Sequence, residues 1–92
     1  MAFDIHRKDN NQYLFSLNEN TFQLLKPVFE QFYQKTGLQF DYYKDLQLSV
    51  GHQKLLIDLI LASKITKTEV ISFQKILKQT SENQAEIKFY CD

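Results

Sequence analysis

Glycine, proline, cysteine and tryptophan are scarce in this chain. Its 92 residues contain two glycines, one proline, one cysteine and no tryptophan. Phosphate-binding loops depend on several glycines, so we expect no nucleotide and no other cofactor. The single cysteine, Cys91, cannot form an intramolecular disulfide, and a chain without disulfides is typical of the cytoplasm.

An excess of charge of one sign is also missing. Eleven basic and eleven acidic residues give a formal net charge of zero, so no overall field attracts the chain to DNA, RNA or an anionic bilayer. The apolar run at residues 55–62 is too short to span a membrane, and the N-terminal residues lack an apolar stretch of signal-peptide length. We therefore expect a cytoplasmic protein with no nucleic-acid partner and no membrane partner.

Motifs for metal binding and catalysis are absent as well. His6, His52 and Cys91 lie far apart in sequence and form no C-x-x-C or H-x-x-x-H spacing, so we expect no metal site. There is no G-x-S-x-G motif, and Ser49 is better explained as a helix cap than as a nucleophile. We expect that the chain is not an enzyme and has no catalytic residues.

What the chain does contain is enough apolar material for a core. Hydrophobic residues make up 43% and aromatic residues 14% of the sequence, which is the opposite of a disordered composition. The length allows one domain, residues 1–92, with a radius of gyration of about 12 Å.

Three segments alternate apolar and polar residues with the period of a half-buried strand. The first two, separated by the polar turn 8–12, predict a hairpin. The residues expected on the apolar faces are Phe3 and Ile5 in the first segment, Tyr13, Phe15 and Leu17 in the second, and Ile87, Phe89 and Cys91 in the last.

A first helix is predicted after the hairpin, with Asn18 or Asn20 as its N-cap and Gly37 at its C-terminal end. Its apolar residues recur at intervals of three and four: Phe22, Leu25, Val28, Phe29 and Phe32. Pro27 lies inside this pattern, so we expect a kink or a break near residues 24–26, with two short helices as the alternative.

Two further helices are predicted. Ser49 can cap a helix that runs to about Ser63, and the apolar run 55–62 within it predicts a helix that is covered on most sides. We expect its residues Leu56, Leu59 and Ile60 to be buried and Asp58 to mark a narrow solvent edge. Thr66 and Glu69 have the spacing of a capping box. The third helix would then place Val70, Phe73, Ile76 and Leu77 inward and end near Gln79.

The order of these elements predicts the fold class. Two strands, three helices and a last strand favour an α+β domain in two layers, in which helices cover one face of a three-stranded, mainly antiparallel sheet. The C-terminal strand should join the hairpin, because an isolated hairpin is marginal in water.

A tyrosine-rich segment precedes the second helix and is the strongest candidate site. It contains Asp41, Tyr42, Tyr43, Lys44 and Asp45, and His52 follows in the first turn of the helix. Tyrosines beside charges of both signs are typical of protein interfaces. Two alternatives remain: the carboxylates and His52 could support acid-base catalysis, or the tyrosines could pack within their own domain.

The chain also resembles a class of bacterial proteins in several short stretches: Phe15-Ser16-Leu17, Phe22, Leu25 with Pro27-Val28-Phe29, Thr36-Gly37-Leu38, Asp41-Tyr42-Tyr43-Lys44-Asp45 and Gly51-His52-Gln53-Lys54-Leu55-Leu56. It is similar in these to small stand-alone immunity proteins encoded beside polymorphic or contact-dependent toxins. The resemblance implies stoichiometric, non-catalytic inhibition of a cognate toxin. The balanced charge of this chain differs from the strongly acidic immunity proteins that neutralise nucleases, which argues against a nuclease as the partner.

These observations lead to a main hypothesis and two alternatives. The main one is a non-catalytic, protein-binding module, an immunity protein that occludes its partner through residues 41–45 and His52. The first alternative is a small regulatory or structural subunit that forms homodimers through a sheet edge, where the last strand would carry Cys91. The second is a small acid-base hydrolase.

Overall fold

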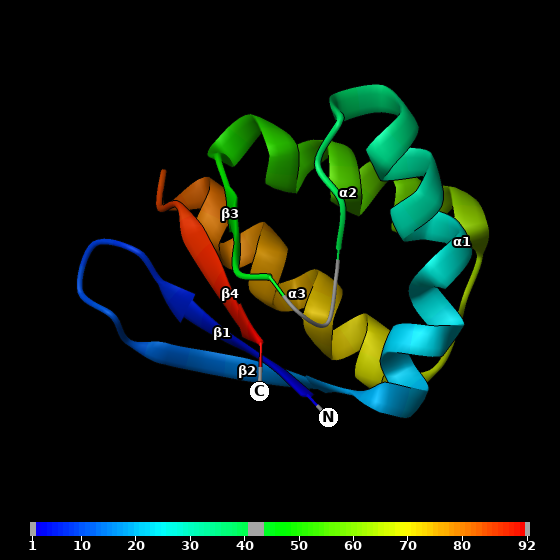
Figure 1. Ribbon diagram of the computed structural model, residues 1–92, viewed down its shortest axis with the longest axis horizontal. Helices are drawn as coiled ribbons and strands as arrows, with labels where there is room; N and C mark the ends of the chain where they lie inside the picture. The colour runs from blue at the N-terminus through cyan, green and yellow to red at the C-terminus, as the bar shows by residue number, and fades with distance from the viewer. Residues whose placement is uncertain (1, 41–43, 92) are drawn as a thin grey trace.

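The computed structural model describes residues 2–40 and 44–91 (Figure 1). In these residues the elements follow in this order: β1 (Ala2–Arg7), β2 (Tyr13–Asn18), α1 (Glu19–Thr36), β3 (Leu46–Leu48), α2 (Val50–Ser63), α3 (Thr68–Glu82) and β4 (Ile87–Cys91). The predicted α+β class is confirmed. The sheet has four strands in the described part of the chain, not the three that were expected.

The strand order of the antiparallel sheet is β2-β1-β4-β3. The C-terminal strand joins the hairpin as expected, with Phe3 opposite Cys91 in the pairing of β1 with β4. The added strand β3 pairs with the other side of β4, where Leu46 lies opposite Phe89. The expectation that Cys91 lies on an edge strand is therefore wrong, because β4 is an interior strand and β2 and β3 form the edges.

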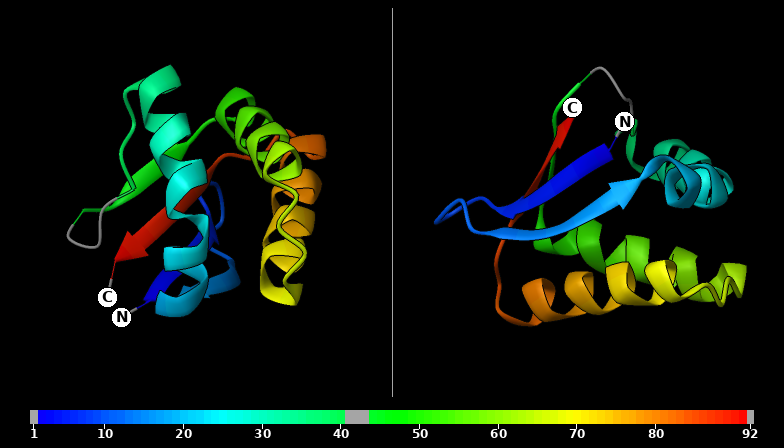
Figure 2. Two further views of the ribbon diagram at one scale, coloured as in Figure 1. Left: turned by 90° about the vertical axis from the view of Figure 1, so that its right-hand side faces the viewer. Right: turned by 90° about the horizontal axis from the view of Figure 1, so that it is seen from below.

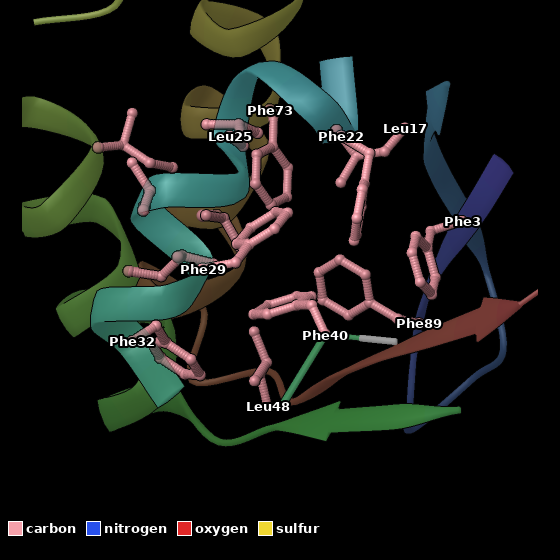
Figure 3. Packing of buried hydrophobic residues seen from close by; sticks show 14 of the residues in the cluster. Phe3, Leu17, Phe22, Leu25, Phe29, Phe32, Phe40, Leu48, Phe73 and Phe89 are labelled. Atoms are coloured by element: carbon pink, nitrogen blue, oxygen red, sulfur yellow. The ribbon is translucent and has the colours of Figure 1, made fainter. Parts of the chain in front are cut away.

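The described helices all lie on one side of the sheet (Figures 1 and 2). Alternate residues of the strands face them and are fully or almost fully buried, among them Phe3, Ile5, Leu17, Leu48, Ile87 and Phe89. Phenylalanines from helix and strand meet in this layer (Figure 3), and the rings of Phe29 and Phe40 stack with their centroids 4.0 Å apart. The core is therefore a single layer between sheet and helices, and the opposite face of the sheet is not covered by any described helix.

Helix α1 is continuous from Glu19 to Thr36 and contains Pro27, so the expected break does not occur. Its caps are the predicted ones: the Asn18 side chain accepts a hydrogen bond from the Thr21 backbone N–H, and Gly37 has a φ of 77°. Pro27 and the residue four positions before it are both exposed. The proline therefore lies on the solvent side of the helix, away from the packed core.

Helix α2 begins as predicted, with the Ser49 side chain accepting a hydrogen bond from the backbone N–H of residue 52. Leu56, Leu59 and Ile60 are buried, as expected, and Asp58 is exposed. The solvent side of the helix is wider than the narrow edge expected at Asp58, because Leu61 in the same apolar run is 60% exposed.

Helix α3 differs from its prediction at both ends. It begins at Thr68 after Lys67, which makes no side-chain capping bond, so the proposed capping box of Thr66 and Glu69 does not form. The helix also continues past Gln79 to Glu82. Thr80 and Ser81, which read as the start of a polar loop, are buried.

Candidate functional site

The uncovered face of the sheet carries polar and aromatic side chains in two cross-strand rows. In the first row, His6 of β1 lies opposite Tyr13 of β2 on one side and Lys88 of β4 on the other, and Lys88 lies opposite Gln47 of β3. The row thus crosses all four strands. Directly opposite side chains in a sheet lie within contact distance of each other.

The second row is shorter and parallel to the first. Asp4 of β1 lies opposite Ser16 of β2 and Tyr90 of β4. We name the two rows together the outer sheet face, which consists of Asp4, His6, Tyr13, Ser16, Gln47, Lys88 and Tyr90.

Tyr13 reaches this face because the pairing of β1 with β2 is irregular. Ile5 pairs with Phe15, but the next residue, His6, pairs with Tyr13, so Leu14 is an extra residue in β2. Leu14 packs against the core together with Phe15. The bulge reverses the alternation, and the prediction that Tyr13 shares a face with Phe15 and Leu17 is therefore wrong.

The ring of His6 lies between two tyrosines. Its centroid is 5.5 Å from that of Tyr13, with the planes at 73°, and 5.1 Å from that of Tyr90, with the planes at 82°. Edge-to-face pairs of this kind contribute about 0.5–1.5 kcal/mol each beyond their burial. The three rings therefore hold one another in fixed orientations.

His6 also carries an unpaired polar atom. Its Nδ1 is buried and has no hydrogen-bond partner within the described part of the chain. A buried polar atom without a partner costs about 1–3 kcal/mol. Such groups are rare in native proteins and are commonly satisfied by an ordered water or an ion.

A chain of hydrogen bonds fixes the neighbouring side chains. The Ser16 hydroxyl donates to Oδ1 of Asp4 over 2.6 Å, and the Tyr13 hydroxyl lies 2.7 Å from Oγ of Ser16. Serine has one hydroxyl proton, which Asp4 receives, so Tyr13 must be the donor to Ser16. The phenol oxygen of Tyr13 consequently keeps lone pairs free to accept a bond from a partner, and its ring is 56% exposed.

Lys88 supplies the positive charge of the face. Its Nζ lies 4.8 Å from the ring centroid of Tyr90, within the range of a cation–π contact. Tyr90 in turn donates a long hydrogen bond of 3.4 Å to the side chain of Asn11, in the turn between β1 and β2. With Asp4 in the other row, the outer sheet face presents both charge signs around a rigid aromatic centre.

The contacts of Ser16 and His6 differ from those of a serine–histidine catalytic pair. Ser16 is bonded to Asp4 and Tyr13, while the contacts of His6 are with the rings of Tyr13 and Tyr90. A serine nucleophile needs a base within hydrogen-bond reach of its hydroxyl that can take the proton and return it. The histidine of this face does not occupy that position relative to Ser16.

The residues predicted as the partner-binding site are placed as follows. Asp41, Tyr42 and Tyr43 lie outside the described residues. Lys44 and Asp45 are exposed and lead directly into β3. Since β3 contributes Gln47 to the outer sheet face, these two residues lie at its margin.

His52 belongs to a different part of the molecule. It is half-buried in the first turn of α2, and its ring meets that of Phe32 in α1 at 6.0 Å and 79°. The structure therefore does not bring His52 to the outer sheet face. Conversely, the rings of His6, Tyr13 and Tyr90 were not predicted as site residues. A signal for His6 and Tyr90 exists in the sequence, because each places an aromatic ring at a polar position of the first or last strand.

Three further findings concern metal ligands, membrane spans and related proteins. Within residues 2–40 and 44–91, no group of three or more His, Cys, Asp and Glu side chains is placed to hold a metal ion. Among the described helices, none has the length and apolar character needed to cross a membrane. Comparisons with protein-family models, with curated proteins and with solved structures find no match for this chain.

Proposed function

We propose that this chain is a non-catalytic protein-binding module and that the outer sheet face is the centre of its contact surface. The observation that carries the proposal is the His6 ring held between Tyr13 and Tyr90. Rings that are already fixed lose little freedom on binding, so their contact area converts efficiently into affinity. Tyrosine is also among the residues that dominate protein interfaces.

The charge of the face favours a protein over a nucleic acid. Asp4 lies in the middle strands next to Tyr90, where it would repel a phosphate backbone, and Lys88 is the single lysine of the two rows. A protein surface can offer a donor to Asp4 and an acceptor to Lys88 at once. Opposed charges of this kind set orientation and partner choice more than raw affinity.

The size of the face indicates that neighbouring segments take part. The strands β1, β2, β4 and β3 have six, six, five and three residues. At about 3.3 Å per residue and about 4.8 Å between strands they cover roughly 300 Å², whereas a standard interface buries about 800 Å² on each partner. We therefore propose that the contact extends over Lys44 and Asp45 beside β3, and that Asp41, Tyr42 and Tyr43 contribute with them.

The resemblance to bacterial immunity proteins makes the proposal more specific. We propose that the chain acts in the cytoplasm, binds a cognate toxin in a stoichiometric complex and inhibits it by covering its functional surface. The zero net charge argues for a toxin that is not a nuclease.

The test uses the toxin-like product of a neighbouring gene, or a partner recovered from the source cell with the intact chain as bait. Replacing Tyr13 and Tyr90 together by Ala should weaken binding by at least about 2 kcal/mol, a factor near thirty. The matched control is Tyr33→Ala, because Tyr33 is an exposed tyrosine on α1 at 48% exposure. A second double variant, Tyr42→Ala with Tyr43→Ala, tests the neighbouring segment.

The measurements are the dissociation constant and the thermal midpoint of each variant. Equal affinities for the wild type and the Tyr13 and Tyr90 variant, with an intact fold, would remove the outer sheet face from the interface. Binding of single-stranded RNA or DNA at comparable affinity would identify a different class of partner. A loss of binding with Tyr33→Ala alone would indicate that the interface lies on α1.

A second candidate function, self-association, is favoured by the composition of β2. This edge strand, Tyr13–Asn18, contains neither a charged residue nor a proline, two of the devices that protect an edge from pairing with another chain. A third such device, a bulge, is present at Leu14, so pairing would use residues 15–18. Two copies could pair β2 against β2 around a two-fold axis. Light scattering over a range of concentrations under reducing conditions distinguishes this from a monomer of 11.0 kDa.

A further inference from the structure

A groove on the far side of the helical layer offers a second interaction surface. It lies between α2 and α3, has a volume of about 640 Å³, and has Ile57, Leu61 and Ile71 along its length. The buried residues of these two helices, such as Leu56 and Phe73, face the core instead. The groove is therefore separate from the outer sheet face.

The lining residues lie on one face of each helix, and three of them are apolar: Ile57 and Leu61 on α2 and Ile71 on α3. On α2 the groove-lining positions are 54, 57, 58 and 61, and on α3 they are 71, 74, 75 and 78, which is the spacing of one helix face. Leu61 is 60% exposed and Ile71 is 39% exposed. The near-continuous apolar run of α2 is thus explained only in part by the core, and its remaining side faces the groove.

The charged rim of the groove is predominantly basic. Lys54, Lys75 and Lys78 line it together with two acidic residues, Asp58 and Glu82, and all five are exposed. The ion pairs found in the described part of the chain are Arg7–Asp9 and Lys8–Glu86. The ammonium groups of the rim are therefore not engaged in ion pairs of their own domain and are available to an acidic partner.

We infer that the α2–α3 groove binds an amphipathic helix of a partner protein. Its apolar side would lie over Ile57, Leu61 and Ile71, and its acidic residues would face the lysines of the rim. The lining positions run from 54 to 61 on α2 and from 71 to 82 on α3, about 11 and 17 Å at 1.5 Å per residue, so a helix of about 12 residues spans the groove. This is the helix-in-groove mode of recognition.

The excess of lysine decides against a second copy of the chain as the occupant. Packing two grooves together would bring six lysines against four acidic residues, twice the three and two of one copy, and would repeat the imbalance without neutralising it. An acidic helix neutralises it directly. The inference does not depend on the outer sheet face, and variants of each surface test them separately.

The experiment uses the intact chain and a synthetic amphipathic peptide of about 16 residues, a length of about 24 Å as a helix. The peptide has leucines along one side, glutamates on both flanks and a fluorescent label. A second peptide with lysines in place of the glutamates is the matched probe. Anisotropy should show binding of the glutamate peptide at least tenfold tighter than the lysine peptide, and amide NMR shifts should map to α2 and α3.

Variants identify the surface. Leu61→Ser combined with Ile71→Ser should weaken binding at least tenfold, whereas Leu24→Ser should not, because Leu24 is an exposed apolar residue of α1 at 38% exposure. Replacing Lys54, Lys75 and Lys78 by Glu should reverse the preference in favour of the lysine peptide. Since these side chains are exposed, the thermal midpoint should stay within a few degrees of the wild type.

Several results would overturn the inference. They are failure of the glutamate peptide to bind, equal affinity for the two peptides, and shifts that map to β1 and β4. A dimer in sedimentation equilibrium that Leu61→Ser dissociates would identify a second copy as the occupant instead. Displacement of the peptide by sodium laurate, with an affinity of laurate equal to that of the peptide, would identify a site for anionic amphiphiles.

Discussion

The side-chain amide of Gln53 donates a hydrogen bond of 2.8 Å to the backbone carbonyl of Ala85, 32 positions further along the chain. It also donates to the carbonyl of Leu48, at 3.3 Å, and its oxygen accepts from the hydroxyl of Thr80. The side chain of Gln53 has no exposed surface. One buried amide thus ties α2 to α3 and to the segments that end β3 and precede β4.

Gln53→Leu should therefore destabilise the domain by about 3 kcal/mol, even though leucine is the more apolar residue. The substitution removes the donor to two buried carbonyls, those of Leu48 and Ala85, and a buried polar group that loses its partner costs about 1–3 kcal/mol. The hydroxyl of Thr80 keeps its bonds to the carbonyls of Ile76 and Leu77. Urea unfolding measures the change in the free energy of unfolding. Gln47→Leu, at an exposed position of β3, is the control; a loss under about 0.5 kcal/mol at Gln53, the range typical of surface sites, would contradict the account.

Truncation of the core side of α2 should be costly. Leu56→Ala and Ile60→Ala should each lower the free energy of unfolding by about 2–5 kcal/mol, because each leaves a cavity in a packed layer. Leu59→Ala should fall in the same range. Leu61→Ala, in the same helix but 60% exposed, is the internal control and should change stability by less than about 0.5 kcal/mol. Similar losses in the free energy of unfolding for Leu61→Ala and Leu56→Ala would contradict the assignment of Leu56 to the core.

Pro27→Ala should stabilise the domain. Because α1 is continuous through this position, alanine restores the hydrogen bond to the carbonyl four residues earlier and removes the clash of the proline ring, a cost of about 3 kcal/mol in an ideal helix. Alanine also makes the unfolded chain freer, which offsets about 1 kcal/mol. We expect a net gain of about 1–2 kcal/mol in a urea melt. No gain would indicate that the proline has a compensating contact.

The carboxyl group of Asp9 should titrate below its ordinary range. The Arg7 guanidinium donates two hydrogen bonds to it, at 2.8 and 3.1 Å, and these bonds are the main cause that lowers the pKa of Asp9. Desolvation opposes them, and the attraction of the Arg7 charge adds a smaller lowering effect. NMR titration of Asp9 in the wild type and in Arg7→Gln checks this, and the variant should return the pKa to the ordinary range.

The sign of the stability effect follows from the direction of that shift. A lowered folded-state pKa means that the pair stabilises the fold above the pKa of an unfolded aspartate, roughly pH 4. This contribution is lost as the pH falls through the lower, folded-state pKa. Since the pair is on the surface, salt should reduce the effect. A pKa for Asp9 that does not respond to the loss of Arg7 would contradict this assignment.

The local signals in the sequence were sufficient for most of the helices. The caps at Asn18, Gly37 and Ser49 each rest on chemistry within four residues, and all three are confirmed. The spacing of apolar residues likewise identified the buried side of each helix. These features depend on neighbours along the chain, which a single sequence contains.

The predictions that were wrong concern features that depend on residues far apart in the sequence. Strand β3 has three residues, too few for an alternating pattern, and it exists because β4 offers an edge far along the chain. The sequence predicts Thr80 as the start of a polar loop, but the residue is buried in α3 and its hydroxyl donates to the side chain of Gln53, 27 positions earlier. Tyr13 changes face because of a bulge in the pairing with β1.

The candidate site also depends on residues that are distant in the sequence. Asp4 and Tyr90 lie opposite each other in adjacent strands, yet they come from opposite ends of the chain. The face they form depends on the strand order, which alternation along one strand does not specify. The residues of the tyrosine-rich segment are consecutive, so the sequence indicates them as a group. The tyrosines of the outer sheet face are scattered along the chain.

The interior position of β4 also has a consequence during synthesis of the protein. The ribosome produces β1, β2 and β3 before Ile87–Cys91, the strand that both β1 and β3 pair with. Until residue 91 has cleared the exit tunnel, the hairpin lacks its inner neighbour and β3 lacks any partner in the sheet, so the apolar sides of the helices have no complete layer to pack on. Folding of this domain should therefore be completed after translation of β4, and chaperone protection should matter most for the nascent chain just before that strand emerges.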